Sequence, residues 1–105
     1  MSTSKSSKSN HFLSEDELEE VALRFRLLGE PMRLRILQAV CRKARTVGEI
    51  VAATGATQAN VSKHLALLAG AGILARQKDG QHVYYGLKDQ LALKLCALVH
   101  KHLAP

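Results

Sequence analysis

Two short helical segments on either side of Gly55-Ala56 constrain the fold of this chain more than any other feature of its sequence. Thr46-Val47-Gly48-Glu49 has the pattern of a capping box, which predicts a first helix that ends at Gly55. Thr57 can cap a second helix, which is predicted to run to about Ala69. Two helices joined by so short a turn have the dimensions of a helix-turn-helix.

The second of these helices is predicted to have two different faces. At about 100° per residue, Val61, Leu65 and Leu68 point toward one side, as residues that pack in a core do. The opposite side carries small and polar residues, which are Ala59, Asn60, Ser62, Lys63 and Ala66. Small residues let a helix enter a DNA major groove, which is about 12 Å wide. The sequence therefore predicts a DNA-reading helix over about residues 57–68.

Asp-Gly dipeptides are a strong hairpin signal, and Asp79-Gly80 separates two predicted strands, residues 73–78 and 81–87. A strict two-residue turn would place Leu74 opposite Tyr85 and Arg76 opposite Val83. The alternation of apolar residues is imperfect, so a longer loop is the alternative.

The chemistry of the reading helix and of the hairpin predicts a set of DNA contacts. Gln58 and Asn60 offer paired donors and acceptors to adenine, and Lys63 can reach guanine or phosphate. Basic residues near the hairpin tip suit the DNA backbone or minor groove, as in a wing; the alternative is a hairpin with a merely soluble tip. The full predicted DNA-binding set is Thr57, Gln58, Ala59, Asn60, Ser62, Lys63 and His64 from the helix, with Arg76, Lys78 and His82 from the hairpin.

Further start and stop signals complete the predicted order of elements. Ser14-Glu15-Asp16-Glu17 is another capping box, Gly29 ends the helix that it opens, and Pro31 suits the first turn of the next helix. A last helix is expected over about residues 88–103. The order helix, helix, helix, helix, hairpin, helix is a mostly α, α+β winged helix-turn-helix. Residues 1–12 are Ser- and Lys-rich and are predicted to be a disordered tail to a domain over residues 13–105.

Charge is distributed unevenly along the 105 residues. From Pro31 to Pro105 there are 11 Lys or Arg and three acids, a net charge of +8. A basic body favours a polyanionic partner such as double-stranded DNA, although a solvated surface is the plainer interpretation. No apolar run approaches the ~20 residues that span a membrane, and the first ten residues lack the apolar segment of a secretion signal. The chain is therefore expected in the cytoplasm, without a membrane partner.

The chain resembles the ArsR/SmtB-type winged-helix repressors over roughly residues 17–103. The matching segments are residues 27–37, 46–50, 58–68, 71–74 and 80–87, of which Ser-x-His-Leu and Tyr-Tyr-x-Leu are the most specific. The resemblance implies a homodimer joined by the first and last helices. It also implies repression of an inverted-repeat operator and release by an inducer. The last helix supports dimerisation independently, because it is apolar on more than one face and needs burial on two sides.

The inducer sites known in such repressors are largely missing from this sequence. No Cys-x-Cys pair occurs in residues 46–51, and Asp89 and His102 fill only two of the four positions of a zinc site on the last helix. Two ligands make a poor zinc site, so a metal ion is only an alternative and no cofactor is predicted. Cys41 and Cys96 lie on the two helices that supply a thiol pair in relatives that sense sulfide or oxidants, but at offset positions. The other interpretation is that both are small hydrophobes of the core.

No catalytic constellation is recognisable, because Ser62 and His64 are two residues apart on a helix and do not face each other. The sequence therefore predicts a sequence-specific DNA-binding transcriptional regulator and not an enzyme. That the regulator is a repressor is implied by the family resemblance alone. The alternative is a winged-helix protein-interaction module without specific DNA binding.

Overall fold

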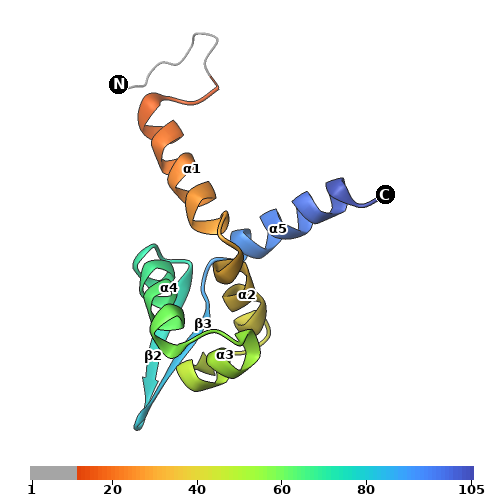
Figure 1. Ribbon diagram of the computed structural model, residues 1–105. Coiled ribbons are helices and arrows are strands. Elements are labelled where there is room, and N and C mark those ends of the chain that lie inside the picture. Colours follow the sequence, from red (N-terminus) through yellow and green to blue (C-terminus); the bar gives the residue numbers. More distant parts are fainter. Residues whose placement is uncertain (1–11) are drawn as a thin grey trace.

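The computed structural model describes residues 12–105 and contains the predicted winged helix-turn-helix (Figure 1). The elements in chain order are α1 (Glu15–Leu28), α2 (Pro31–Val40), β1 (Arg45–Thr46), α3 (Val47–Thr54), α4 (Gln58–Gly70), β2 (Leu74–Asp79), β3 (His82–Leu87) and α5 (Gln90–Leu103). The prediction of a disordered tail concerns residues that, apart from residue 12, lie outside the described part of the chain.

The helices begin where the capping signals predicted. The Ser14 hydroxyl accepts a hydrogen bond from the Glu17 backbone N–H at 3.2 Å, and the Glu17 carboxylate accepts one from the Ser14 N–H at 2.9 Å. Thr46 and Glu49 form the same reciprocal pair at the start of α3. The hydrogen bond from the Thr46 N–H holds the pKa of Glu49 below its ordinary value, because it stabilises the ionised carboxylate. Local side-chain hydrogen bonds therefore determine where these two helices begin.

A third strand, β1, was not predicted from the sequence. It has only two residues, and it pairs antiparallel with β3, with Arg45 opposite Tyr85 and Thr46 opposite Tyr84. The resulting sheet has the order β1-β3-β2. Two residues are too few to show a period-2 pattern, and their partners lie about 40 positions away in the chain.

The predicted register of the hairpin was wrong by two residues. Asp79 pairs with His82, and Arg76 lies opposite Tyr85, so Gly80 and Gln81 form the loop in place of Asp79-Gly80. Gly80 has φ +66°, and the first position of a tight hairpin loop of this kind requires a positive φ. Because side chains alternate with period 2, a shift of two residues leaves every side chain on the face that was predicted for it.

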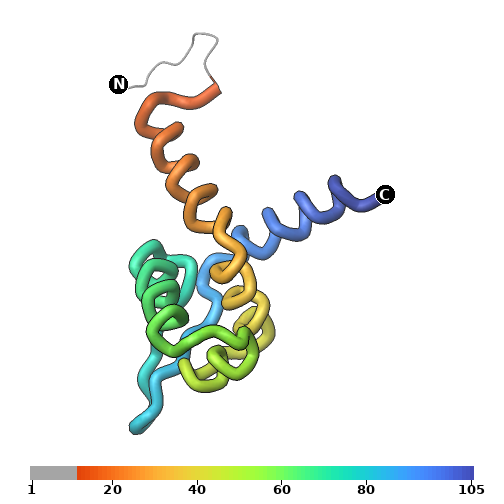
Figure 2. Tube along the Cα trace, viewed as in Figure 1, coloured from red at the N-terminus to blue at the C-terminus, as the bar shows by residue number. Residues whose placement is uncertain are grey.

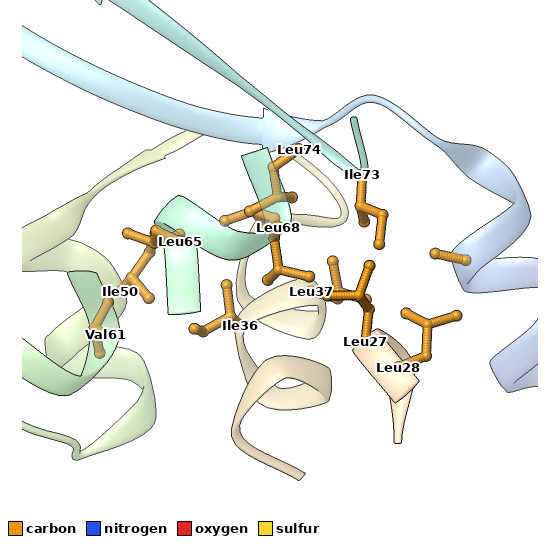
Figure 3. Packing of buried hydrophobic residues seen from close by; sticks show 12 residues of the cluster. Leu27, Leu28, Ile36, Leu37, Ile50, Val61, Leu65, Leu68, Ile73 and Leu74 are labelled. Carbon is orange, nitrogen blue, oxygen red and sulfur yellow. The ribbon is translucent and has the colours of Figure 1, made fainter. Parts of the chain in front are cut away.

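The core is aliphatic and lies inside the winged-helix body (Figure 3). α2, α3, α4 and the chain at and just before the start of β2 contribute its fully buried large side chains, which are Ile36, Leu37, Val40, Ile50, Val61, Leu65, Leu68, Ile73 and Leu74. The end of α1 adds Leu27 and Leu28, and α5 adds only Ala92. This core holds α4 against the rest of the body along one face of the helix.

α1 and α5 extend away from the body on the side opposite the tip of the hairpin (Figures 1 and 2). Both helices carry large apolar side chains that are exposed in the single chain, which are Leu18, Val21, Leu23, Phe25, Leu91, Leu98, Val99 and Leu103. An apolar surface of this extent is typical of a protein–protein contact.

Truncation of Leu65 is expected to destabilise the fold strongly. The side chain is 1% exposed, and Leu65→Ala should lower the free energy of unfolding by about 2–5 kcal/mol through lost burial and a residual cavity. Leu67→Ala is the matched control on the same helix, since Leu67 is 44% exposed and should cost roughly 0.5 kcal/mol. Urea unfolding at one fixed protein concentration measures both, and equal losses would contradict the assignment of the two faces.

Candidate nucleic-acid interface

α4 presents to solvent a face of mostly polar and small side chains. Thr57 caps the helix by accepting a hydrogen bond from the Asn60 backbone N–H at 3.2 Å. Thr57, Gln58, Ala59, Ser62 and Lys63 are exposed, and Asn60 is half-buried. The helix buries Val61, Leu65 and Leu68 on its other side, as predicted. Most of the residues assigned to DNA from this helix therefore share one accessible surface.

His64 is the exception within the predicted set. Its side chain is only 5% exposed, and its Nδ1 accepts a hydrogen bond from Nε of Arg33 at 3.1 Å. The side chain of His64 therefore lies on the buried side of α4 and not on the exposed face. Sequence reasoning missed the contact because Arg33 lies on α2, 31 positions earlier in the chain, and no local pattern connects the two residues.

The environment of His64 disfavours its charged form. Burial lowers the pKa of His64 below its ordinary value, and the positive charges of Arg33 and Lys63 lower it further, whereas the carboxylate of Glu30 acts in the opposite direction. The hydrogen bond from Arg33 also requires an unprotonated Nδ1, because Nε of a guanidinium is only a donor.

The hairpin lies beside α4, with which β2 is in contact, and it supplies the other predicted residues (Figure 1). Arg76, Lys78 and His82 are all exposed. Arg76 and Lys78 lie on the same face of the hairpin, whereas His82, paired with Asp79, lies on the other face. The ring of His82 stands edge-on to that of Tyr84, with centroids 6.3 Å apart. The structure therefore brings two of the three hairpin residues together.

The two cysteines do not form a pair within the described chain. Cys41 is half-buried at the end of α2, where its thiol donates to the carbonyl of Gln38 at 3.3 Å. It lines a cleft with Lys43 and Gly86, whereas Cys96 lines a different groove, between α1 and α5. Neither thiol is fully buried in the single chain.

Asp89 and His102 lie at opposite ends of α5. Asp89 caps the helix by accepting from the Leu91 N–H at 2.9 Å, and its other oxygen lies 3.3 Å from Nη1 of Arg24. That ion pair is a close charge contact without hydrogen-bond alignment, because Nη1 of Arg24 is buried and has no hydrogen-bond partner. Residues 12–105 contain no cluster of three or more potential metal ligands. The helix cap and the ion pair with Arg24 engage the side chain of Asp89 in the fold.

In the described part of the chain, no helix has the length and apolarity needed to cross a bilayer.

Known proteins are similar to this chain in both fold and sequence. The solution structure of a homodimeric winged helix-turn-helix DNA-binding domain from Mycobacterium bovis superimposes with a TM-score of 0.72 at 29% identity, covering 81% of this chain and 79% of that one. The fold is therefore that of the winged helix-turn-helix regulators. A family model described as "Bacterial regulatory protein, arsR family" matches residues 30–76.

Two curated relatives strengthen this assignment. The transcriptional regulator CmtR of Mycobacterium bovis is 40% identical over 80 residues, covering 75% of this chain and 68% of that protein. A probable mercury resistance operon repressor of Streptomyces lividans is 36% identical over 74 residues, covering 70% of this chain and 59% of that protein. The chain therefore spans less than two thirds of the length of the Streptomyces repressor. With these matches, the chain belongs to the arsR family of bacterial regulatory proteins.

Family membership confirms the predicted class of a transcriptional regulator with a winged-helix fold. The family and the matched relatives are regulators and not enzymes, as the sequence predicted.

Asp89→Ala is expected to lower the free energy of unfolding by about 1 kcal/mol, since it removes the N-cap of α5. Asp89→Ser is the matched control, because a serine hydroxyl keeps the cap and loses only the partly exposed ion pair, which is worth about 0–1 kcal/mol. Thermal and urea unfolding should therefore rank the wild type close to the serine variant and above the alanine variant. An equal loss in both variants would mean that the ion pair, and not the cap, is the stabilising contact.

Proposed function

We propose that the chain is a transcriptional repressor that binds an inverted-repeat operator as a homodimer, with α4 as the recognition helix. The observation that carries this proposal is the one-sided burial of α4, whose apolar face is held in the core while its opposite face is exposed. A recognition helix in the major groove reads bases with side chains from one exposed face.

The side chains of this surface suit the proposed roles. Gln58 and Asn60 carry amides that can pair with adenine, and Lys63 can reach guanine or a phosphate. Thr57 and Ser62 can donate hydroxyl hydrogen bonds to phosphate, and Ala59 gives the helix room to approach the bases. Arg76 and Lys78 on the wing would add sequence-independent contacts to the backbone.

The position of α1 and α5 suits dimerisation without obstructing DNA. Both helices extend away from the tip of the wing, so a partner bound there would leave α4 and the wing accessible (Figure 1). In such a dimer the two recognition helices would enter successive major grooves, about 34 Å apart.

The matched relatives suggest that an inducer releases the DNA, and one of them is named for resistance to mercury. Cys41 and Cys96 line separate clefts, and Asp89 caps α5. A thiol sensor or a metal site built from these residues would therefore need side chains from a second copy or a rearrangement.

Loss of basic side chains on the proposed surface should weaken operator binding. Lys63→Ala and Arg76→Ala are each expected to raise the dissociation constant about tenfold and to flatten its salt dependence by about one unit of slope. Lys101→Ala is the charge-matched control, since this lysine is exposed near the end of α5. Fluorescence anisotropy with a duplex selected from a random pool measures the affinities at matched salt.

If both variants bind like the wild type, the assigned contacts are wrong. If the wild type shows no preference for any duplex over heparin, the chain is a protein-interaction module and not a DNA reader.

A charge introduced on the exposed face of α5 should separate the dimer without unfolding the chain. Leu98 is 64% exposed in the single chain, so Leu98→Glu removes little packing within it. Burying that carboxylate at a dimer contact should raise the dimer dissociation constant at least about tenfold. Analytical ultracentrifugation measures this constant, and Leu67→Glu on α4 is the control. A dimer unaffected by Leu98→Glu would exclude this part of α5 from the interface.

A further inference from the structure

His64 is the one polar side chain among residues 12–105 that lies buried with the aliphatic core. It lies in the middle of α4, and the residue before it, Lys63, is on the exposed face. Its Nδ1 accepts a hydrogen bond from Nε of Arg33 at 3.1 Å, which connects α4 directly to the first turn of α2. A buried polar contact of this kind is directional, whereas the apolar contacts around it are not.

The guanidinium of Arg33 also reaches the end of α1. Its Nη1 lies 3.4 Å from the carbonyl oxygens of both Arg26 and Leu27, in the last turn of that helix. Carbonyl groups at a helix C-terminus lack partners within the helix and carry negative partial charge, so they favour a cation at this position. One side chain therefore contacts the last turn of α1 and the middle of α4.

We propose that Arg33 and His64 are positioning residues, which hold the recognition helix α4 in a fixed orientation to α1 and are required for tight DNA binding. This inference rests on the proposed function, in which α4 reads DNA and α1 joins two copies. In that dimer the orientation of α4 relative to α1 determines how the two recognition helices face successive grooves. Arg33 and His64 would thus transmit the geometry of the dimer contact to the DNA-reading surface.

Protonation of His64 would break this link. A second ring proton turns Nδ1 from an acceptor into a donor, which would then face the N–H of Arg33, with positive charge on both groups. The charged groups around the ring are Glu30 and Arg33 on the α2 side and Lys63 on α4. Burial lowers the pKa of His64, so the neutral ring stabilises the fold fully above the unfolded value of about 6.5. That contribution is lost as the pH falls through the lower pKa of the folded state.

The experiment compares the affinity of wild type, His64→Asn, His64→Leu and Arg33→Met for the selected duplex, between about pH 5 and 8 at constant ionic strength. Asn carries a carbonyl oxygen close to the position of Nδ1 and does not titrate, so His64→Asn should bind within about threefold of wild type at pH 7.5. His64→Leu keeps an apolar filling without an acceptor, and Arg33→Met removes the donor. Each should bind about tenfold more weakly or worse.

The pH profile separates a positioning role from a merely structural one. Wild type should lose affinity relative to His64→Asn by about tenfold or more as His64 becomes protonated, whereas the ratio should stay constant above the pKa. His82 is unchanged in both proteins, so any contribution from it cancels in the ratio. Parallel profiles for wild type and His64→Asn would overturn the proposal, as would wild-type affinity in His64→Leu.

A second measurement covers variants that fold poorly. The imidazole nitrogen resonances of wild-type protein should report the tautomer with its proton on Nε2 at pH 7.5, and protonation of Nδ1 in step with the loss of affinity. A proton on Nδ1 at pH 7.5 would overturn the proposal without any variant. Failure of the proposed function is distinguishable, because the wild type itself would then prefer no duplex at any pH, and that result would overturn both proposals.

Discussion

The packing of Val61, Leu65 and Leu68 against the rest of the core is the interaction on which the other features of this structure depend. These side chains are almost fully buried, so they determine which side of α4 faces inward. Since a helix has a fixed angular period, the same contact determines which side faces solvent. The orientation of the polar surface is therefore a consequence of hydrophobic burial, and side chains on the exposed face can differ without disturbing the fold.

The body and the two outer helices have different relations to this core. α2, α3 and α4 with the start of β2 bury their apolar faces against one another and supply most of the core. α1 and α5 contribute their ends to the core and leave long apolar faces exposed. Apolar area in contact with water has an unfavourable free energy, so these helices gain stability from a second copy that the single chain cannot supply. Folding of the winged-helix body and association of two chains therefore depend largely on different residues.

Local chemistry made much of this fold predictable. The capping residues Ser14, Thr46 and Thr57 determine where helices start, and glycines mark where some of them end, so the order of the helices followed from the sequence. The two faces of α4 followed from its apolar period. The two-residue strand β1 and the exact loop of the hairpin did not, because both depend on pairing between separate segments. The Arg33–His64 contact joins residues 31 positions apart, and no local sequence pattern at either residue predicts it.

Thr46 has two structural roles at once, because β1 pairs with β3. Its backbone belongs to the sheet opposite Tyr84, and its side chain caps α3. The wing is therefore joined directly to the first turn of α3, because the same residue, Thr46, pairs with β3 and caps the helix. A force that bends the wing sideways acts directly on the start of α3. The base of the wing therefore has a fixed position relative to the start of α3, and a partner surface must match the resulting spacing of the wing and the helix-turn-helix.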